Sequence, residues 1–223
     1  MIIDCHAHTS NHKLWGLHTE SATIETLEGY ARQYDVRKII LMATYFPFKG
    51  TGLHNLELLS RIKGNKLFAA CVSLDMSGEI DSGLSKIEQL AKNSQVVGIK
   101  MYPGYQDFDS ASGNAKQVYQ LALKYNLPVI FHSGNLHKCC TEDQRRSGKT
   151  RCKKDNCPLE NLQHLSEPRL IPVADYPNVN FVISHMAEPY FEQTIEIIRN
   201  NDNVYTDISG LVSSGSFRDD IEF

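Results

Sequence analysis

The stretch Met1-Ile2-Ile3-Asp4-Cys5-His6-Ala7-His8 decides which parallel α/β fold the sequence predicts. It is an apolar run of strand length, and a His-x-His pair follows it at once. The first strand of an open, doubly wound sheet is usually followed by a glycine-rich turn, and residues 1–8 contain no glycine. A closed (β/α)₈ barrel instead gathers polar groups at the C-terminal ends of its strands. The opening stretch therefore favours the barrel, if strands and helices alternate further along the chain.

Apolar runs of strand length do recur along the whole chain. We expect seven strands, at Ile2–Cys5, Val36–Ala43, Leu67–Leu74, Val96–Met101, Leu127–Phe131, Val179–Ser184 and Asn203–Thr206. The runs are continuous in Val, Ile and Leu rather than alternating, which is typical of strands buried on both faces. Five helical stripes lie between them: Ile24, Leu27, Ala31 and Tyr34; Leu58, Leu59 and Ile62; Leu84, Ile87 and Ala91; Val118, Leu121, Ala122 and Tyr125; Phe191, Ile195 and Ile198.

This alternation predicts a single α/β domain over residues 1–223 with a (β/α)₈ TIM-barrel type of fold. A complete barrel has about 250 residues, and only seven strand–helix units can be counted here. We therefore expect the barrel to be incomplete at its C-terminus, without its eighth strand.

Composition excludes several other classes of protein. Hydrophobic residues make up 41% of the 223 residues and charged residues 22%, which is ordinary for a globular domain. No run approaches the roughly 18 apolar residues of a membrane span, and the start resembles no signal peptide, so we expect a cytoplasmic protein. The net charge of −3, from 23 basic and 26 acidic residues, provides no field that would attract nucleic acid or a membrane. We expect a small-molecule substrate and leave a homodimer open.

His6 and His8 are the first candidate metal ligands. Residues two apart in a strand point to the same side, so both imidazoles would project together from the end of the first strand. A pair of surface histidines is the alternative. His132 ends the fifth predicted strand and His185 the sixth, so four histidines lie where a barrel gathers its catalytic groups. This recurrence predicts a divalent metal, most simply zinc, bound by three or four of them.

Five motifs, in chain order, resemble those of the amidohydrolase superfamily, in the branch that includes aminocarboxymuconate-semialdehyde decarboxylase. They are Asp4–His8, Gly98–Pro103, His132–Gly134, Ser184–Met186 and Tyr205–Gly210. The resemblance implies that His6, His8 and His132 bind the metal. It also implies that His185, the catalytic residue, either contacts the metal or activates the water or substrate beside it. The family also uses an aspartate at the end of the eighth strand, which this chain lacks. Asp207 ends the seventh strand, where the family often has an Asp-x-Ser-Gly without a ligand role.

The resulting prediction is a metal-dependent hydrolase in which a metal-activated water attacks a small, carboxylated substrate. A decarboxylase or hydratase of the same family would use the same arrangement and is an alternative. A TatD-like nuclease is another, although such enzymes have a glutamate where this chain has Lys100. An inactive barrel that lacks the catalytic aspartate is the third.

Lys100, at the end of the fourth predicted strand, has two interpretations. In two-metal members of the superfamily a carboxylated lysine at this place bridges both ions. Because lysine more often binds an anion as a point charge, we expect Lys100 to pair with an acidic neighbour or with a substrate carboxylate.

Residues 135–159 form a basic, cysteine-containing insertion that follows the fifth strand and would lie over the barrel mouth. Between Lys138 and Lys154 there are seven Lys or Arg residues against two acidic ones. Cys139, Cys140, Cys152 and Cys157, with His137, could hold a second zinc, but their spacing lacks a Cys-x-x-Cys pair. A flexible lid with free thiols or a disulfide is the simpler expectation. Cys5 and Cys71 lie within apolar runs and are expected in the core.

Overall fold

The computed structural model describes residues 1–9, 22–44, 52–78, 80–136 and 158–211. Its strands are β1 (Ile2–Ala7), β2 (Val36–Met42), β3 (Phe68–Ser73), β4 (Val96–Met101), β5 (Val129–Phe131), β6 (Phe181–Ile183) and β7 (Val204–Thr206). Its α-helices are α1 (Ile24–Gln33), α2 (Asn55–Ile62), α3 (Ile80–Leu90), α4 (Gly113–Tyr125), α6 (Pro158–Leu162) and α7 (Phe191–Asn200). All seven predicted strands and the five predicted helices are present, with ends that differ by a few residues.

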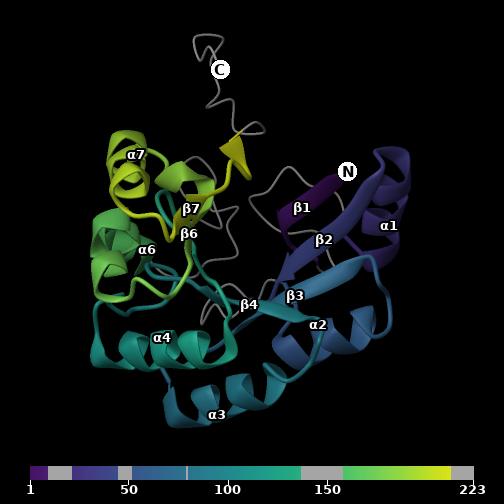
Figure 1. Cartoon of the computed structure of the whole chain (residues 1–223), viewed down its shortest axis with the longest axis horizontal. Helices are drawn as coiled ribbons and strands as arrows, with labels where there is room; N and C mark the ends of the chain where they lie inside the picture. The colour runs from purple at the N-terminus through teal and green to yellow at the C-terminus, as the bar shows by residue number, and fades with distance from the viewer. Residues whose placement is uncertain (10–21, 45–51, 79, 137–157, 212–223) are drawn as a thin grey trace, which may run out of the picture.

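The seven strands form one parallel sheet in chain order, from β1 to β7. Figure 1 shows the sheet curving so that β1 and β7 lie on either side of an opening, while the helices cover the outside. The described residues thus have the architecture of an incomplete TIM barrel with seven strands, which confirms the predicted fold class. Parallel strands need helical crossovers on their faces, and this requirement explains why the apolar runs are continuous.

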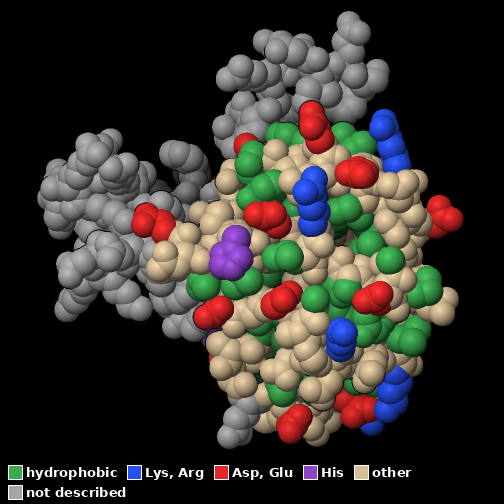
Figure 2. Space-filling view, turned by 90° about the vertical axis from the view of Figure 1, so that its left-hand side faces the viewer, with side chains coloured by type: hydrophobic (Ala, Val, Ile, Leu, Met, Phe, Trp, Pro, Cys, Tyr) green, Lys and Arg blue, Asp and Glu red, His purple; other side chains and the backbone are tan. Residues whose placement is uncertain are grey.

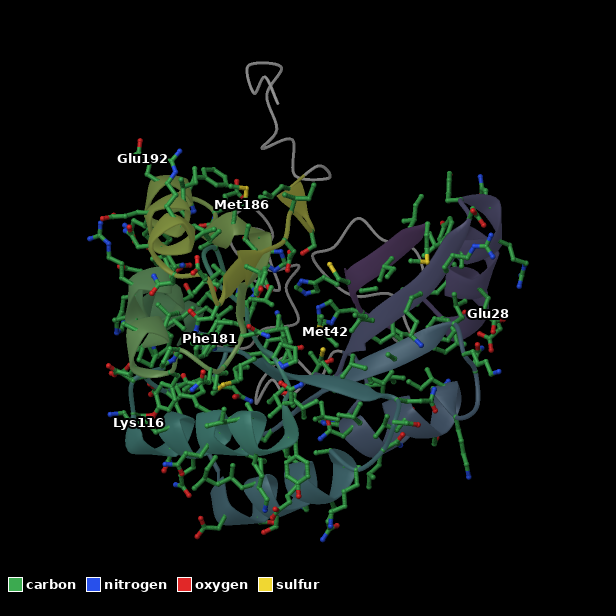
Figure 3. The ribbon with its side chains drawn as sticks, in the orientation of Figure 1. Glu28, Met42, Lys116, Phe181, Met186 and Glu192 are labelled. Carbon is green, nitrogen blue, oxygen red and sulfur yellow. The ribbon has the colours of Figure 1, made fainter. Side chains whose placement is uncertain are left out.

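The larger part of the core lies between the outer face of the sheet and the helices. Phe131 of β5 and Phe181 of β6 pack there against Tyr119 of α4, with ring centroids 6.1 and 5.5 Å from the tyrosine ring. Figure 3 shows Phe181 on this outer side and Met42 of β2 toward the centre of the curved sheet. Met42, with Cys71 and Ile130, belongs to a separate inner cluster. The sheet is thus buried on both faces, as its sequence predicts.

Apolar residues are exposed at the two edges of the described sheet. Within the described residues, β1 pairs only with β2 and β7 only with β6. Met1, Ile2 and Ile3 are exposed along β1, and Tyr205 and Ile208 lie exposed on or beside β7. Cys5 is also exposed, so its predicted core position is wrong, because β1 lies at an edge of the sheet. Cys71, on the inner strand β3, is buried as predicted.

Neither the charges on one face of the molecule nor the described helices indicate a function. Figure 2 shows one face of the molecule, on which the described acidic and basic side chains intermingle without a continuous basic patch. None of the described helices has the length and apolar character needed to cross a membrane. Residues 137–157, which include most of the predicted insertion and its four cysteines, lie outside the described part of the chain.

We expect Gly29→Ala to raise the free energy of unfolding by about 0.5–1 kcal/mol. Gly29 lies inside α1, and an added Cβ would have nothing within 4 Å. Alanine therefore gains helix propensity without a clash. Urea denaturation measures the change, with Gly113→Ala as the control, since Gly113 is equally unobstructed but is the first residue of α4. An unchanged or lower stability of Gly29→Ala would contradict the expectation.

Candidate metal centre

Four histidines meet at the C-terminal ends of β1, β5 and β6. The ring centroids of His6 and His8 are 5.4 Å apart, those of His6 and His185 are 5.0 Å apart, and those of His185 and His132 are 5.2 Å apart. The rings therefore form one row, in the order His8, His6, His185, His132. Because all strands are parallel, their C-terminal ends lie on the same side of the sheet, and residues up to 179 positions apart in sequence become neighbours.

Asp207 and Ser209, just beyond β7, connect two of these histidines. Asp207 Oδ2 lies 2.8 Å from His6 Nδ1, so the carboxylate is hydrogen-bonded to the His6 ring. The hydroxyl oxygen of Ser209 lies 3.0 Å from His6 Nδ1 and 2.9 Å from His185 Nδ1. Potential ligand atoms of His6, His185 and Asp207 all lie within 4.8 Å of one another. Asp207, to which the sequence assigned no ligand role, thus lies in the centre of the site.

His132 lies at the other end of the row. Its ring centroid is 4.6 Å from that of Tyr105, and its Nε2 is 3.2 Å from the carbonyl oxygen of Asn135. It is not part of the group formed by His6, His185 and Asp207. Of the predicted ligands His6, His8 and His132, only His6 belongs to that group, and His8 and His132 lie at the two ends of the row. The predicted catalytic residue His185 lies between His6 and His132.

A left-handed turn sets the position of His185. The φ angles of His185, Met186 and Ala187 are 61°, 48° and 49°, a conformation that residues other than glycine rarely adopt. The Met186 N–H donates to the Asp207 carbonyl over 2.9 Å, and the Thr194 hydroxyl donates to the Met186 carbonyl over 3.0 Å. Strained backbone of this kind clusters at functional sites, where surrounding contacts hold it.

Electrostatics keep the imidazoles neutral. Burial and the positive charge of Lys100 lower the pKa of His6, although Asp207 opposes them. Burial and neighbouring His6 hold the pKa of His8 well below its usual range. Burial, with His6 and Lys100, lowers the pKa of His185 to about 3. Burial disfavours the charged form of Asp207, but the hydrogen bond from His6 and the charge of Lys100 outweigh it and lower its pKa. Near neutral pH the rings of His6, His8 and His185 are therefore neutral and Asp207 is a carboxylate.

Lys100, the predicted substrate-binding residue, is completely buried at the end of β4. Its ammonium donates to the Ser184 hydroxyl over 2.9 Å and lies 5.4 Å from the centroid of the Tyr102 ring. Burial lowers its pKa to about 8, against the attraction of Asp207. The lysine thus places a positive charge beneath the histidines.

The donor set fits a divalent metal. His6 Nε2 is buried and has no hydrogen-bond partner among the described residues, which is costly unless a ligand occupies it. Histidine binds metals in its neutral form, and this is the form that burial and Lys100 favour here. Imidazole nitrogens with a carboxylate suit zinc and related ions.

Sequence reasoning missed two residues of the site. Ser209 lies within the motif Tyr205–Gly210, and its spacing of two from Asp207 after a strand was the available signal. Tyr105, just beyond β4, packs against His132.

Comparison with known families now adds to this geometry. A family model described as amidohydrolase matches residues 3–223. This chain belongs to the amidohydrolase family. The match confirms the resemblance that the five motifs indicated, and it covers every residue of the amidohydrolase site described above.

Solved structures similar to this amidohydrolase chain confirm its TIM-barrel fold. An uncharacterised TIM-barrel protein from Bordetella bronchiseptica has a TM-score of 0.62 at 12% identity, over 84% of this chain and 59% of that one. A probable 2-pyrone-4,6-dicarboxylic acid hydrolase from Acinetobacter baumannii, with citric acid bound, has a TM-score of 0.59 at 14% identity, over 95% and 71%. The 5-carboxyvanillate decarboxylase of Sphingomonas paucimobilis has a TM-score of 0.56 at 14% identity, over 88% and 68%.

This chain therefore spans less than two thirds of the length of the Bordetella protein and about 70% of the other two. Among curated proteins, none matches the sequence.

Proposed function

We propose that this amidohydrolase is a metal-dependent hydrolase that acts on a small, carboxylated molecule in the cytoplasm. The observation that carries the proposal is the row of four histidine rings, in which His6 Nε2 is buried without a partner among the described residues. His6, His8 and His132 would hold a divalent metal, most simply zinc, as the sequence predicts. A metal there supplies Lewis-acid chemistry: it polarises a substrate oxygen and makes water more acidic.

The residues around the metal have separate tasks in this proposal. His185 is fixed through Nδ1 by the Ser209 carbonyl, 2.6 Å away, which leaves Nε2 as the atom that accepts and returns a proton. The charge of Lys100, beneath the rings, favours an anionic substrate. The substrate of the Acinetobacter relative, by its name, is a dicarboxylic acid, which supports the carboxylated class.

Decarboxylation is a second candidate for the same site. Similar folds include 5-carboxyvanillate decarboxylase and 2,6-dihydroxybenzoate decarboxylase, and the substrates in both names carry a carboxylate. The two reactions differ in what leaves the substrate. A panel of carboxylated aromatic compounds and cyclic esters, assayed for released carbon dioxide and for ring-opened acid, distinguishes decarboxylation from hydrolysis.

Metal analysis tests the proposal before any substrate is known. We expect about one zinc-type ion per chain in the purified protein, and at least about a tenfold weaker affinity in His6→Ala and in His132→Ala. His164→Ala is the matched control, because His164 is exposed and lies outside the row of rings. A protein that binds no divalent metal, or variants that bind it as tightly as the wild type, would overturn the proposal.

A further inference from the structure

The hydrogen bonds around Asp207 leave little freedom in the placement of protons. Asp207 Oδ1 accepts from the backbone N–H of His185, from the backbone N–H of Ser209 and from the Ser209 hydroxyl. The first two distances are both 3.1 Å. Since all three groups are donors, Oδ1 is saturated. Oδ2 remains, and it lies 2.8 Å from His6 Nδ1.

An ionised carboxylate accepts hydrogen bonds and cannot donate them. His6 Nδ1 must therefore carry the hydrogen that it shares with Oδ2. The same reasoning applies to His185, whose Nδ1 is 2.6 Å from the backbone carbonyl of Ser209, another pure acceptor. The Ser209 hydroxyl has one hydrogen, which it gives to Asp207, so its oxygen can only accept from the two rings.

We infer that Asp207 and Ser209 are positioning residues that hold His6 and His185 as Nδ1–H tautomers, which leaves the Nε2 lone pair of His6 free for a divalent metal and that of His185 free to accept a proton. The inference deepens the proposed metal site and rests on it for the identity of the ligand, but the tautomers themselves exist without metal. Free histidine side chains favour the other tautomer, so the network reverses the intrinsic preference of the ring. The partnerless Nε2 of His6 agrees with this assignment.

Asp207→Asn should change His6 from the Nδ1–H tautomer to the Nε2–H tautomer. The three donors that converge on Oδ1 require the amide oxygen to stay there, so the amide NH₂ would take the place of Oδ2. That NH₂ would donate to His6 Nδ1, and the ring would then carry its hydrogen on Nε2. Asparagine in place of an orienting aspartate changes a histidine tautomer in this way when the surrounding geometry stays intact.

Nitrogen-15 NMR of the histidine rings in the metal-free protein tests the inference. In the wild type we expect His6 and His185 to show protonated Nδ1 and unprotonated Nε2. In Asp207→Asn the His6 pattern should reverse, and zinc affinity by titration should fall about 10- to 100-fold. Ser209→Ala should weaken zinc binding less, and Ser209→Thr should restore it because the hydroxyl remains. Ile208→Ala, in the exposed residue between them, is the control and should change neither readout.

These outcomes distinguish failure of the tautomer assignment from failure of the proposed function. A wild-type spectrum with hydrogen on Nε2 of His6 or His185 overturns the inference without any variant, so it does not depend on whether Asp207→Asn folds. An unchanged His6 pattern in a folded Asp207→Asn protein also overturns it. If His6 and His185 show the Nδ1–H tautomers but the protein binds no zinc, the positioning role of Asp207 and Ser209 stands. The proposed function is then refuted instead.

Discussion

Gly134→Ala should lower the free energy of unfolding by about 3 kcal/mol, and the same substitution should weaken metal binding. Gly134 has a φ of 81°, and an added Cβ would lie 2.2 Å from the Glu188 carbonyl oxygen and 2.4 Å from the Ala187 carbonyl carbon. Both are backbone atoms, one in the last residue of the left-handed turn and one in the residue after it, so a side-chain rotation cannot relieve the clash. Alanine also adopts a positive φ at a cost, and overpacking adds about 1–3 kcal/mol.

The effect should reach the histidines because Gly134 lies between them. It follows His132 by two residues, and it packs against the residues that follow His185. Its N–H donates to the Ser166 carbonyl over 2.9 Å, and its carbonyl accepts from the Ser166 hydroxyl and from Gln163. Since these contacts hold Gly134 from the other side, we expect the clash to move the turn and separate His185 from His132.

Gly64→Ala is the matched control for this substitution. Gly64 has a similar φ of 75°, but an added Cβ there would have nothing within 4 Å. Gly64→Ala should lower the free energy of unfolding by only about 1 kcal/mol, because only the backbone conformation is unfavourable for alanine. Denaturant melts and zinc titration measure both variants. Equal losses of stability in the two, or full zinc affinity in Gly134→Ala, would show that the close approach to residues 187 and 188 does not matter.

Lys100→Met should raise the stability of the metal-free protein at pH 7 by about 2 kcal/mol. Burial lowers the pKa of Lys100 from 10.5 to about 8, and at about 1.4 kcal/mol per pKa unit the charged form destabilises the fold by about 3 kcal/mol. Methionine removes that cost, which already includes the attraction to Asp207, while the lost hydrogen bond to the Ser184 hydroxyl offsets part of the gain. Met also fills a similar volume in the buried position.

The pH dependence gives this prediction a second readout. In the wild type, Lys100 loses its proton near pH 8 when folded but near 10.5 when unfolded. Between these values the unfolded chain binds more protons, so the contribution of Lys100 to stability should rise with pH. That rise should be absent in Lys100→Met. Lys116→Met, which replaces an exposed lysine of α4 that points away from the fold in Figure 3, should change stability by less than about 0.5 kcal/mol. A destabilised Lys100→Met protein that keeps the rise would contradict the prediction.

The sequence predicted the fold because each strand and helix has its own local pattern. The continuous apolar run Val96–Met101 and the stripe of Val118 and Ala122 identify β4 and α4 directly. The ends of β5 and β6 were placed to within a few residues, which put His132 and His185 on the same side of the sheet. The exposure of Cys5 was not predictable in this way, since it depends on β1 being an edge strand.

By itself, then, the sequence determined the family, the parallel sheet and the meeting of four histidines, because side-chain periodicity and strand direction are properties of short segments. Only the tertiary structure decided which groups contact the nitrogens of His6 and His185 and which charges surround them. Asp207 and Ser209 reach His6 across about 200 residues of chain, and Lys100 reaches Ser184 across 84. Distances of hydrogen-bond length between such remote residues arise when the sheet curves, and no local pattern encodes them.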